Sequence, residues 1–590
     1  MNFFNFLTML GGLALFLYGM SMLGDGLSAA SGGRLEKILE KLTSNKFKAV
    51  LVGLGVTAVI QSSSATTVMV VGFVNSGIMK LEQAVGIIMG ANIGTTVTSW
   101  ILSTAGISSS SFFVQLLKPT SFAPVMAIIG VGMFMVSKKD KIHNAAMILL
   151  GFAILMMGME TMSSAVKPLA NVPEFTGVLT RFSNPLLGML AGVLLTAIIQ
   201  SSSASVGILQ ALCLTGAVGY SAALPIIMGQ NIGTCVTAML SGVGASKNGK
   251  RAALVHLYFN VIGTVLFMVL FYAINAIVPF SFMTQSATPV GIAMIHSVFN
   301  VFATVVLFPF SNVLVKLAYL TVRDTDQAGE PKEGDRTLQV LDPRFLETPS
   351  YAVEQSKNVA SVMAQKAEEA LNLSMELLHG YEEGKAEKVE LLEQEVDKYE
   401  DELGSYLVKL SAKNLQGKDS HTLSEILHCI GDFERISDHA LHIERAAREL
   451  RDKELKFSDK AQAELIVLQR AIHDILKITT LSFAEEDLEL AKQVEPLEEV
   501  IDMLDLEIRQ RHIKRLRKGK CTIELGFILS DIINDFERVS DHCSNIAVCL
   551  LEVSEDEFDT HAYLQEMKSK ENMDFQGKVM AYKDRYQLPE

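Results

Sequence analysis

Two polar motifs interrupt long apolar stretches of this sequence. QSSS occurs at Gln61–Ser64 and again at Gln200–Ser203, and NIGT follows each copy at one interval, at Asn92–Thr95 and Asn231–Thr234. Hydroxyl and amide groups are costly to bury in a bilayer, so a duplicated set of them indicates a binding site. Such groups carry no charge of their own, and they can bind an oxyanion at a helix N-terminus or supply oxygen ligands to a hard cation.

The motifs belong to an internal duplication in which one constant offset relates the two copies. The offset that takes Gln61 to Gln200 also takes Gly53 to Gly192 and Gly90 to Gly229, without any gap. A repeat of this kind indicates duplicated structural units. In membrane proteins such units are typical of transporters, in which the substrate lies between the repeats near the middle of the bilayer.

The chain up to Leu320 contains seven apolar runs that are long enough to cross a membrane. The segments that lead into QSSS, Phe47–Ile60 and Pro185–Ile199, are shorter than the roughly 20 residues that a spanning helix needs. We therefore expect each to form one limb of a re-entrant hairpin with QSSS at its tip. The predicted spans are Phe3–Leu23, Leu81–Leu102, Phe112–Val136, Ile142–Met162, Ala222–Val243, Ala252–Val278 and Val290–Leu320.

Charge divides the chain into two regions near Leu320. The region up to Leu320 carries 16 Lys and Arg against 7 Asp and Glu, and the remainder carries 35 against 58. Basic loops face the cytoplasm, so the lysines and arginines predict an external N-terminus and a cytoplasmic acidic region. Three spans per repeat would then invert one repeat relative to the other. Since no basic segment precedes Phe3–Leu23, we expect a retained helix rather than a signal peptide.

The hairpin tips define the predicted substrate site. A hairpin that breaks at QSSS presents the N-terminus of its second limb, where unpaired N–H groups and the helix dipole favour an anion. We expect a tetrahedral oxyanion to contact the serines, and unwound carbonyls and neighbouring amides and hydroxyls to bind sodium. The predicted anion ligands are Ser62, Ser63, Ser64, Ser201, Ser202 and Ser203; the predicted sodium ligands are Gln61, Gln200, Asn92, Thr95, Thr96, Asn231 and Thr234.

Other polar residues in this region have ordinary structural interpretations. Small and hydroxylated residues can simply allow helices to pack, although a gapless duplicate makes this alternative weaker. The pairs His256 with Asn260 and His296 with Asn300 have i, i+4 spacing, and we interpret them mainly as hydrogen-bonding residues that hold helices together. Asn92 and Asn231 are also expected to tie the broken segments to each other.

On the QSSS, NIGT and HxxxN residues the chain resembles the type II sodium-dependent phosphate cotransporter family over Gly12–Phe310. The resemblance implies sodium-coupled movement of inorganic phosphate, with phosphate between the two hairpin tips. Electrogenic animal members have an acidic residue after the first NIGT motif, whereas Ser99–Val136 contains no Asp or Glu here. We therefore expect fewer sodium ions per phosphate.

From Tyr351 onward the sequence has helical periodicity and a second repeat. GDFERISDHA at Gly431–Ala440 recurs as NDFERVSDHC at Asn534–Cys543, and another Glu-x-x-x-Asp pair precedes each copy. We expect two three-helix bundles in tandem. Like charges at i, i+4 repel, and a cation between them would remove that repulsion. With the neighbouring His439 and His542, these carboxylates could hold divalent metals or a small metal cluster. The alternative is a solvated acidic face that Arg435 and Arg538 neutralise.

This region resembles the PhoU family of phosphate-signalling regulators over Ala352–Val553. The resemblance implies divalent or iron-type metal binding at the acidic motifs, and contacts with other phosphate-signalling proteins. By the resemblance, the metal ligands are Glu393, Asp397, Glu434, Asp438, Glu498, Asp502, Glu537 and Asp541.

Together these features predict an all-α protein of the cell membrane with a multi-pass domain of two inverted repeats, in contact with lipid, and a soluble PhoU-like pair of bundles. The alternatives are a phosphate-sensing scaffold, an exporter, or a transporter of another oxyanion. We expect no enzyme activity, no disulfides and no nucleic-acid binding; a homodimer stays open. The expected divisions are 1–140 and 141–320 for the repeats, 321–350 for a linker, 351–553 for the bundles and 554–590 for an acidic tail.

Overall fold

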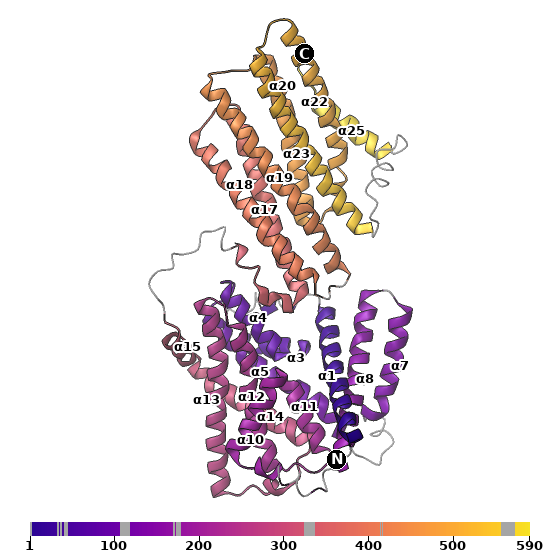
Figure 1. Ribbon diagram of the computed structural model, residues 1–590, viewed down its shortest axis with the longest axis vertical. Helices are drawn as coiled ribbons and strands as arrows, with labels where there is room; N and C mark the ends of the chain where they lie inside the picture. Colours follow the sequence, from indigo (N-terminus) through magenta and orange to yellow (C-terminus); the bar gives the residue numbers. More distant parts are fainter. Residues whose placement is uncertain are drawn as a thin grey trace. The chain divides into compact units, whose positions relative to one another are not determined.

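A computed structural model shows an all-helical protein, as predicted (Figure 1). It describes residues 3–589 except for 32–34, 36–37, 40–44, 107–118, 138, 169–171, 173–176, 178, 324–336, 414, 416 and 556–572. Within the described residues the extended pairing is limited to one isolated bridge between Gly219 and Ser286. The chain divides into two compact units, Met1–Pro331 and Lys332–Glu590.

The first unit contains six helical segments that are long and apolar enough to cross a membrane, counted over the described residues. They correspond to six of the seven predicted spans. The seventh, Phe112–Val136, is described only from Pro119. The helices are α1 (Phe3–Ser31), α3 (Lys46–Ile60), α4 (Ser63–Asn75), α5 (Leu81–Ser103), α7 (Pro119–Val136), α8 (Asp140–Val166), α10 (Pro185–Ile199), α11 (Ser202–Cys213), α12 (Tyr220–Ser241), α13 (Lys247–Ile277), α14 (Pro289–Leu307) and α15 (Ser311–Thr321).

The short helices before each QSSS motif pack closely on the helices that carry NIGT. A methyl group on Gly90 of α5 would collide with the carbonyl oxygen of Val50 in α3. At the related position of the second repeat, a methyl group on Gly229 of α12 would collide with the carbonyl of Met189 in α10. The two helix pairs therefore cross at equivalent glycines, and the duplication in sequence is also a duplication in packing.

Helices α1 and α8 begin the two predicted repeats and run antiparallel (Figure 1). Gly12 faces the backbone of Met162, whereas Gly19, further along α1, faces the backbone of Leu155, which is earlier in α8. Glycines along the shared face let the backbones approach closely. An antiparallel pair is the arrangement that inverted repeats require, and the inversion of the repeats as wholes stays a prediction.

The second unit consists of two three-helix bundles, as predicted. The first bundle contains α17 (Pro349–Leu377), α18 (Glu383–Ser411) and α19 (Lys418–Asp452), and the second contains α20 (Asp459–Glu485), α22 (Val494–Arg517) and α23 (Ile523–Glu555). Their apolar faces form buried cores that include Phe433, Ile472 and Phe536. Helices α19 and α23, which carry the duplicated FER motif, pack on each other and join the bundles.

The C-terminal region, predicted only as an acidic tail, contains one further helix. Helix α25 (Met573–Arg585) packs on α22, and its apolar residues Phe575 and Val579 are buried. The hydroxyl of Tyr586 donates a hydrogen bond to Oδ2 of Asp474 in α20. Part of the predicted tail is thus attached to the second bundle; residues 556–572 lie outside the described chain.

Candidate functional site

Each QSSS motif lies at a break between two short helices. Gln61 (φ 60°, ψ 19°) is the C-cap residue that follows α3, and Gln200 (φ 60°, ψ 20°) is the C-cap residue that follows α10. Both residues adopt the left-handed conformation, which is uncommon for residues other than glycine. Each backbone N–H donates to the threonine carbonyl four residues earlier, Thr57 or Thr196. The chain reverses at both motifs with the same geometry, as the predicted re-entrant hairpins require.

The first serine of each motif caps the helix that follows. Oγ of Ser62 accepts a hydrogen bond from the N–H of Ala65 (3.1 Å), and Oγ of Ser201 accepts one from the N–H of Ala204 (3.2 Å). These caps satisfy one N–H group at the start of α4 and of α11. The remaining N–H groups of each first turn have no carbonyl partner in their own helix, so both N-termini are suited to an anion.

The two hairpin tips lie next to each other. The Ser64 hydroxyl donates to the carbonyl oxygen of Gln200 at 3.4 Å, which links the first repeat to the second. Ser63, Ser202 and Ser203 are buried, and the other predicted anion ligands are partly exposed. The structure thus brings both predicted sets of serines to one region of the first unit.

The NIGT motifs lie within two of the predicted membrane spans. They lie inside the continuous helices α5 and α12, and the amide groups of Asn92 and Asn231 donate to carbonyls four residues earlier in the same helix. One N–H of each amide is therefore used within its own helix, and the expectation that these asparagines tie the broken segments together stays a prediction. The predicted sodium ligands Thr95, Thr96 and Thr234 also donate to carbonyls of their own helices.

Thr98, which was not among the predicted site residues, connects the first tip to α5. The hydroxyl of Thr98 donates to Oε1 of Gln61 at 2.9 Å, and the Gln61 side chain is buried. The related Gln200 side chain is exposed. The two tips therefore share their backbone geometry but differ in how their glutamines are held.

Buried polar residues around α5 and α14 extend this region. His296 Nδ1 and Ser99 Oγ are 2.8 Å apart, and Nε2 of Gln210 donates to the carbonyls of Ser99 and Pro289. His296 thus holds α14 against α5, in agreement with its structural interpretation. Gln210 lies on α11, and its position in an apolar stretch after QSSS was the signal that could have identified it.

Gln230 is a buried polar side chain of the first unit that makes no hydrogen bond within the described residues. It is fully buried on α12, and neither its Nε2 nor its Oε1 has a hydrogen-bond partner among the described residues. An unpaired buried amide costs free energy, on the order of 1–3 kcal/mol. The first repeat has Ala91 at the related position. This departure from the repeat was a signal available in the sequence.

In the second unit, the first set of predicted metal ligands comes together between α18 and α19. Burial raises the pKa of Glu393, and the negative charges of Asp438 and Asp397 raise it further. Burial likewise raises the pKa of Glu434 to about 6, with Asp438 adding to the effect. Carboxylates that repel one another in this way form a set of oxygen donors suited to a hard cation.

The second set has arginine partners. NH2 of Arg509 lies 3.3 Å from Oε2 of Glu537, and NH1 of Arg538 lies 3.4 Å from Oδ2 of Asp541. Arg538 therefore neutralises a carboxylate, as expected for a solvated acidic face. The contact of Arg509 with Glu537 was not predicted. Glu498 is buried and Asp502 is exposed. Arginine charges act on the first set as well, because Arg445 lowers the pKa of Glu393 and Arg435 lowers that of Glu434, although burial and the neighbouring aspartates outweigh them.

A cavity of about 780 Å³ lies where α19 and α23 meet. Members of both predicted sets contribute to it. It also contains His439 and His542, which the sequence places beside the acidic motifs as expected contributors to a metal site, and His442, which was not among the predicted residues. Its lining consists of Glu434, Arg435, Asp438, His439, His442, Arg538, Asp541, His542, Ser544 and Asn545.

Comparison with known proteins identifies two kinds of domain. Residues 15–164 and 154–295 match the Na+/Pi-cotransporter family, and residues 360–447 and 466–550 match the PhoU domain. The two regions that are duplicated in the sequence are thus the two regions that match.

Three relatives cover different parts of the chain. "Putative inorganic phosphate export protein YjbB" of Salmonella typhimurium is 25% identical over 561 residues, which are 92% of this chain and 97% of that protein. "Phosphate-specific transport system accessory protein PhoU homolog 1" of Thermotoga maritima is 28% identical over 32% of this chain and 82% of its own length. "Sodium-dependent phosphate transport protein 2A" of Rattus norvegicus is 38% identical over 97 residues, 16% of this chain and 15% of that protein.

Proposed function

Since residues 15–295 of this chain belong to the Na+/Pi-cotransporter family and its second unit carries two PhoU domains, we propose that the protein uses a sodium gradient to move inorganic phosphate across the cell membrane. Both resemblances drawn from the sequence motifs are confirmed as domain assignments. The observation that carries the proposal is the meeting of two capped helix N-termini at the contact between Ser64 and Gln200.

Phosphate would bind between the hairpin tips. The N-termini of α4 and α11 supply N–H groups and positive dipole ends, and the serine hydroxyls add further donors. Ser63, Ser202 and Ser203 are buried, so their hydroxyls would act where bulk water does not compete. A tetrahedral oxyanion needs several donors from different directions, and two neighbouring helix N-termini provide them.

Sodium would bind beside the same break. The left-handed residues Gln61 and Gln200 leave carbonyl oxygens at the helix ends outside the regular hydrogen-bond pattern, and oxygen atoms are the ligands of hard cations. Gln61 also brings its side-chain oxygen to Thr98 of α5. We propose this neighbourhood, rather than the centres of the NIGT helices, as the sodium site.

The experiment is uptake of radiolabelled phosphate by proteoliposomes under an imposed sodium gradient. Wild-type protein should accumulate phosphate only with sodium outside, and Ser202→Ala should reduce that accumulation at least about tenfold, corresponding to about 1.4 kcal/mol. Ser183→Ala, which removes a hydroxyl in the loop before α10, is the matched control and should transport normally. Binding of phosphate without accumulation would favour the sensing scaffold instead.

Export is the second candidate, because a relative that aligns over 97% of its own length is named for inorganic phosphate export. The direction of flux can be tested with the same vesicles. Loading them with phosphate and measuring efflux with sodium on either side distinguishes coupled export from uptake. Phosphate efflux that ignores the sodium gradient would contradict sodium coupling in both candidates, and competition with sulfate or arsenate would test other oxyanions.

The PhoU unit would regulate this transport from the cytoplasmic side, where the basic loops of the first unit are predicted to lie. We propose that its metal state alters transport, and that it also offers a surface to other phosphate-signalling proteins. Transport by a chain that ends at Arg323 should lose its dependence on internal phosphate or metal. Identical dependence in the shortened and complete chains would exclude this regulation.

A further inference from the structure

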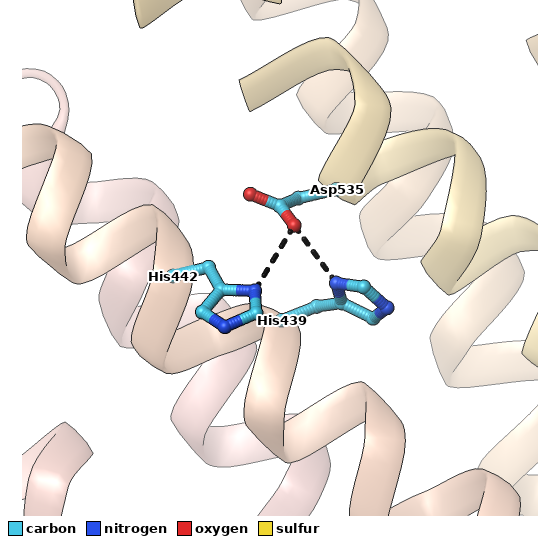
Figure 2. Close-up of side chains that lie close together, drawn as sticks. All are labelled: His439, His442 and Asp535. Atoms are coloured by element: carbon cyan, nitrogen blue, oxygen red, sulfur yellow. Dashed lines mark hydrogen bonds and ion pairs between the residues drawn. The ribbon is translucent and has the colours of Figure 1, made fainter. Parts of the chain in front are cut away.

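Two histidines of the first bundle point at one carboxylate of the second. His439 and His442 lie one turn apart on α19, and Asp535 lies on α23 (Figure 2). Nδ1 of His439 is 2.8 Å from Oδ1 of Asp535, and Nδ1 of His442 is 3.4 Å from the same oxygen. A single carboxylate oxygen therefore faces two imidazole nitrogens, and the three ligand atoms lie within 4.8 Å of one another.

The repeat within the second unit provides an internal comparison. The offset that takes Phe433 to Phe536 also relates Asp432, His439 and His442 to Asp535, His542 and Asn545. Nδ1 of His542 is 2.8 Å from Oδ1 of Asp432, the same distance as in the first pair, and Nδ2 of Asn545 lies 3.4 Å from that oxygen. The two half-sites thus have the same geometry, and they differ in one ligand: an imidazole in one and an amide in the other.

From this convergence we infer that His439, His442 and Asp535 bind one divalent first-row transition-metal ion. Metal–ligand distances of about 2.1 Å place neighbouring ligand atoms roughly 3.0–3.5 Å apart. The separation of His442 from Asp535 already falls in that range, and that of His439 needs to increase by only a few tenths of an ångström. Two histidines and one carboxylate with open positions are a ligand set for iron, cobalt or zinc.

The burial of the three side chains suits an exchangeable ion. The side chains of His439 and Asp535 are 17% and 14% exposed, whereas that of His442 is 50% exposed. Two ligands are therefore largely covered by surrounding protein, and both histidines line the cavity between α19 and α23. The cavity leaves space for water or another small ligand to complete the coordination.

This site shares its cavity with Glu434, Asp438 and Asp541 of the acidic motifs but has ligands of its own. None of its three ligands belongs to the Glu-x-x-x-Asp pairs, and it joins the two bundles, whereas the first acidic set lies between α18 and α19 of one bundle. A His–Asp hydrogen bond alone would not require the second histidine, because the pair His542 with Asp432 forms without one. The inference does not depend on what the first unit transports.

The test uses the complete chain in detergent, stripped with a chelator and titrated with Co2+ while its visible spectrum and bound cobalt are measured. Imidazole nitrogen as a ligand shifts the cobalt bands away from those of carboxylate-bound or aqueous ion, so cobalt at the acidic motifs is distinguished. His442→Asn copies the related half-site and should weaken the histidine-ligated cobalt at least tenfold. Asn545→His should add a second histidine-ligated equivalent.

Melting of the metal-free proteins serves as the folding control, and it should be alike in the wild type and in both variants. A weakened site in His442→Asn together with a gained site in Asn545→His supports the inference. If either variant keeps the spectrum and cobalt content of the wild type, or if the wild type lacks histidine-ligated cobalt, the three residues form a hydrogen-bonded contact only.

Discussion

The Ser64 hydroxyl donates to the main-chain carbonyl of Gln200, a residue 136 positions away, at 3.4 Å. This contact brings the start of helix α4 to the end of helix α10, so the tips of both hairpins meet. Gln200 adopts the left-handed conformation, and its carbonyl is therefore directed away from the α10 hydrogen-bond ladder. The proposed phosphate site depends on this meeting of the two repeats.

Gln61 allows the backbone and side-chain roles of the hairpin tip to be separated. Gln61→Gly keeps the left-handed conformation but removes the amide that Thr98 contacts. Sodium-driven phosphate uptake should fall at least about tenfold, or about 1.4 kcal/mol. Gln61→Ala should lose the same transport and melt earlier than Gln61→Gly, since a left-handed residue with a Cβ costs roughly 1–2 kcal/mol that glycine does not. Wild-type uptake by Gln61→Gly would exclude its side chain from the site.

Gly90 is required for the approach of α3 to α5. A methyl group there meets the carbonyl of Val50, which belongs to a helix backbone and cannot turn away. Gly90→Ala should destabilise the first unit by roughly 1–3 kcal/mol through overpacking. Gly55→Ala is the matched control, because no atom of the described residues lies within 4 Å of its added methyl. Thermal unfolding in detergent gives the comparison, and equal melting of the two variants would contradict this packing argument.

Lys357 should be among the most sensitive residues of the PhoU unit. It forms a buried ion pair with Glu425 and lies over the ring of Phe483. Lys357→Met leaves the carboxylate buried without its cation, which costs about 3–5 kcal/mol. Lys388→Met breaks the exposed pair with Glu369 and should cost at most about 1 kcal/mol. Denaturant unfolding of the second unit, followed in the complete protein, measures the stability lost in each variant. Similar losses in the two variants would contradict the distinction between the buried and the exposed ion pair.

Gln230 should contribute to function at a cost in stability. Its amide is fully buried, and neither polar atom is paired within the described chain, so Gln230→Leu removes a destabilising group of similar size. We expect unchanged or higher thermal stability together with reduced phosphate transport. Thr234→Val, which also changes a polar side chain on α12 but one that has a helical hydrogen bond, provides the comparison. Full transport by Gln230→Leu would show that this amide has no part in it.

Local chemistry explains why so much of the first unit was predictable. The QSSS segments are short apolar helices that end in polar residues, and their serines have the cap preference that starts a new helix. The constant offset between the repeats predicts the same local backbone conformation in both copies, and Gln61 and Gln200 both have a φ of 60°. The contacts that depend on non-local packing were not predictable. The hydrogen bond from Thr98 of α5 to the side chain of Gln61 shows this, because the two residues are 37 positions apart.

The sequence alone determined the helical class, the two duplications and the polar motifs, because periodicity, repeat offset and capping are properties of neighbouring residues. Only the tertiary structure decided which side chains meet. In the folded protein Ser64 donates to the carbonyl of Gln200, Arg509 forms an ion pair with Glu537, and His439 and His442 lie next to Asp535. Each of these contacts joins residues on different helices. The distance between such residues depends on how whole helices pack, and no local sequence pattern specifies that packing.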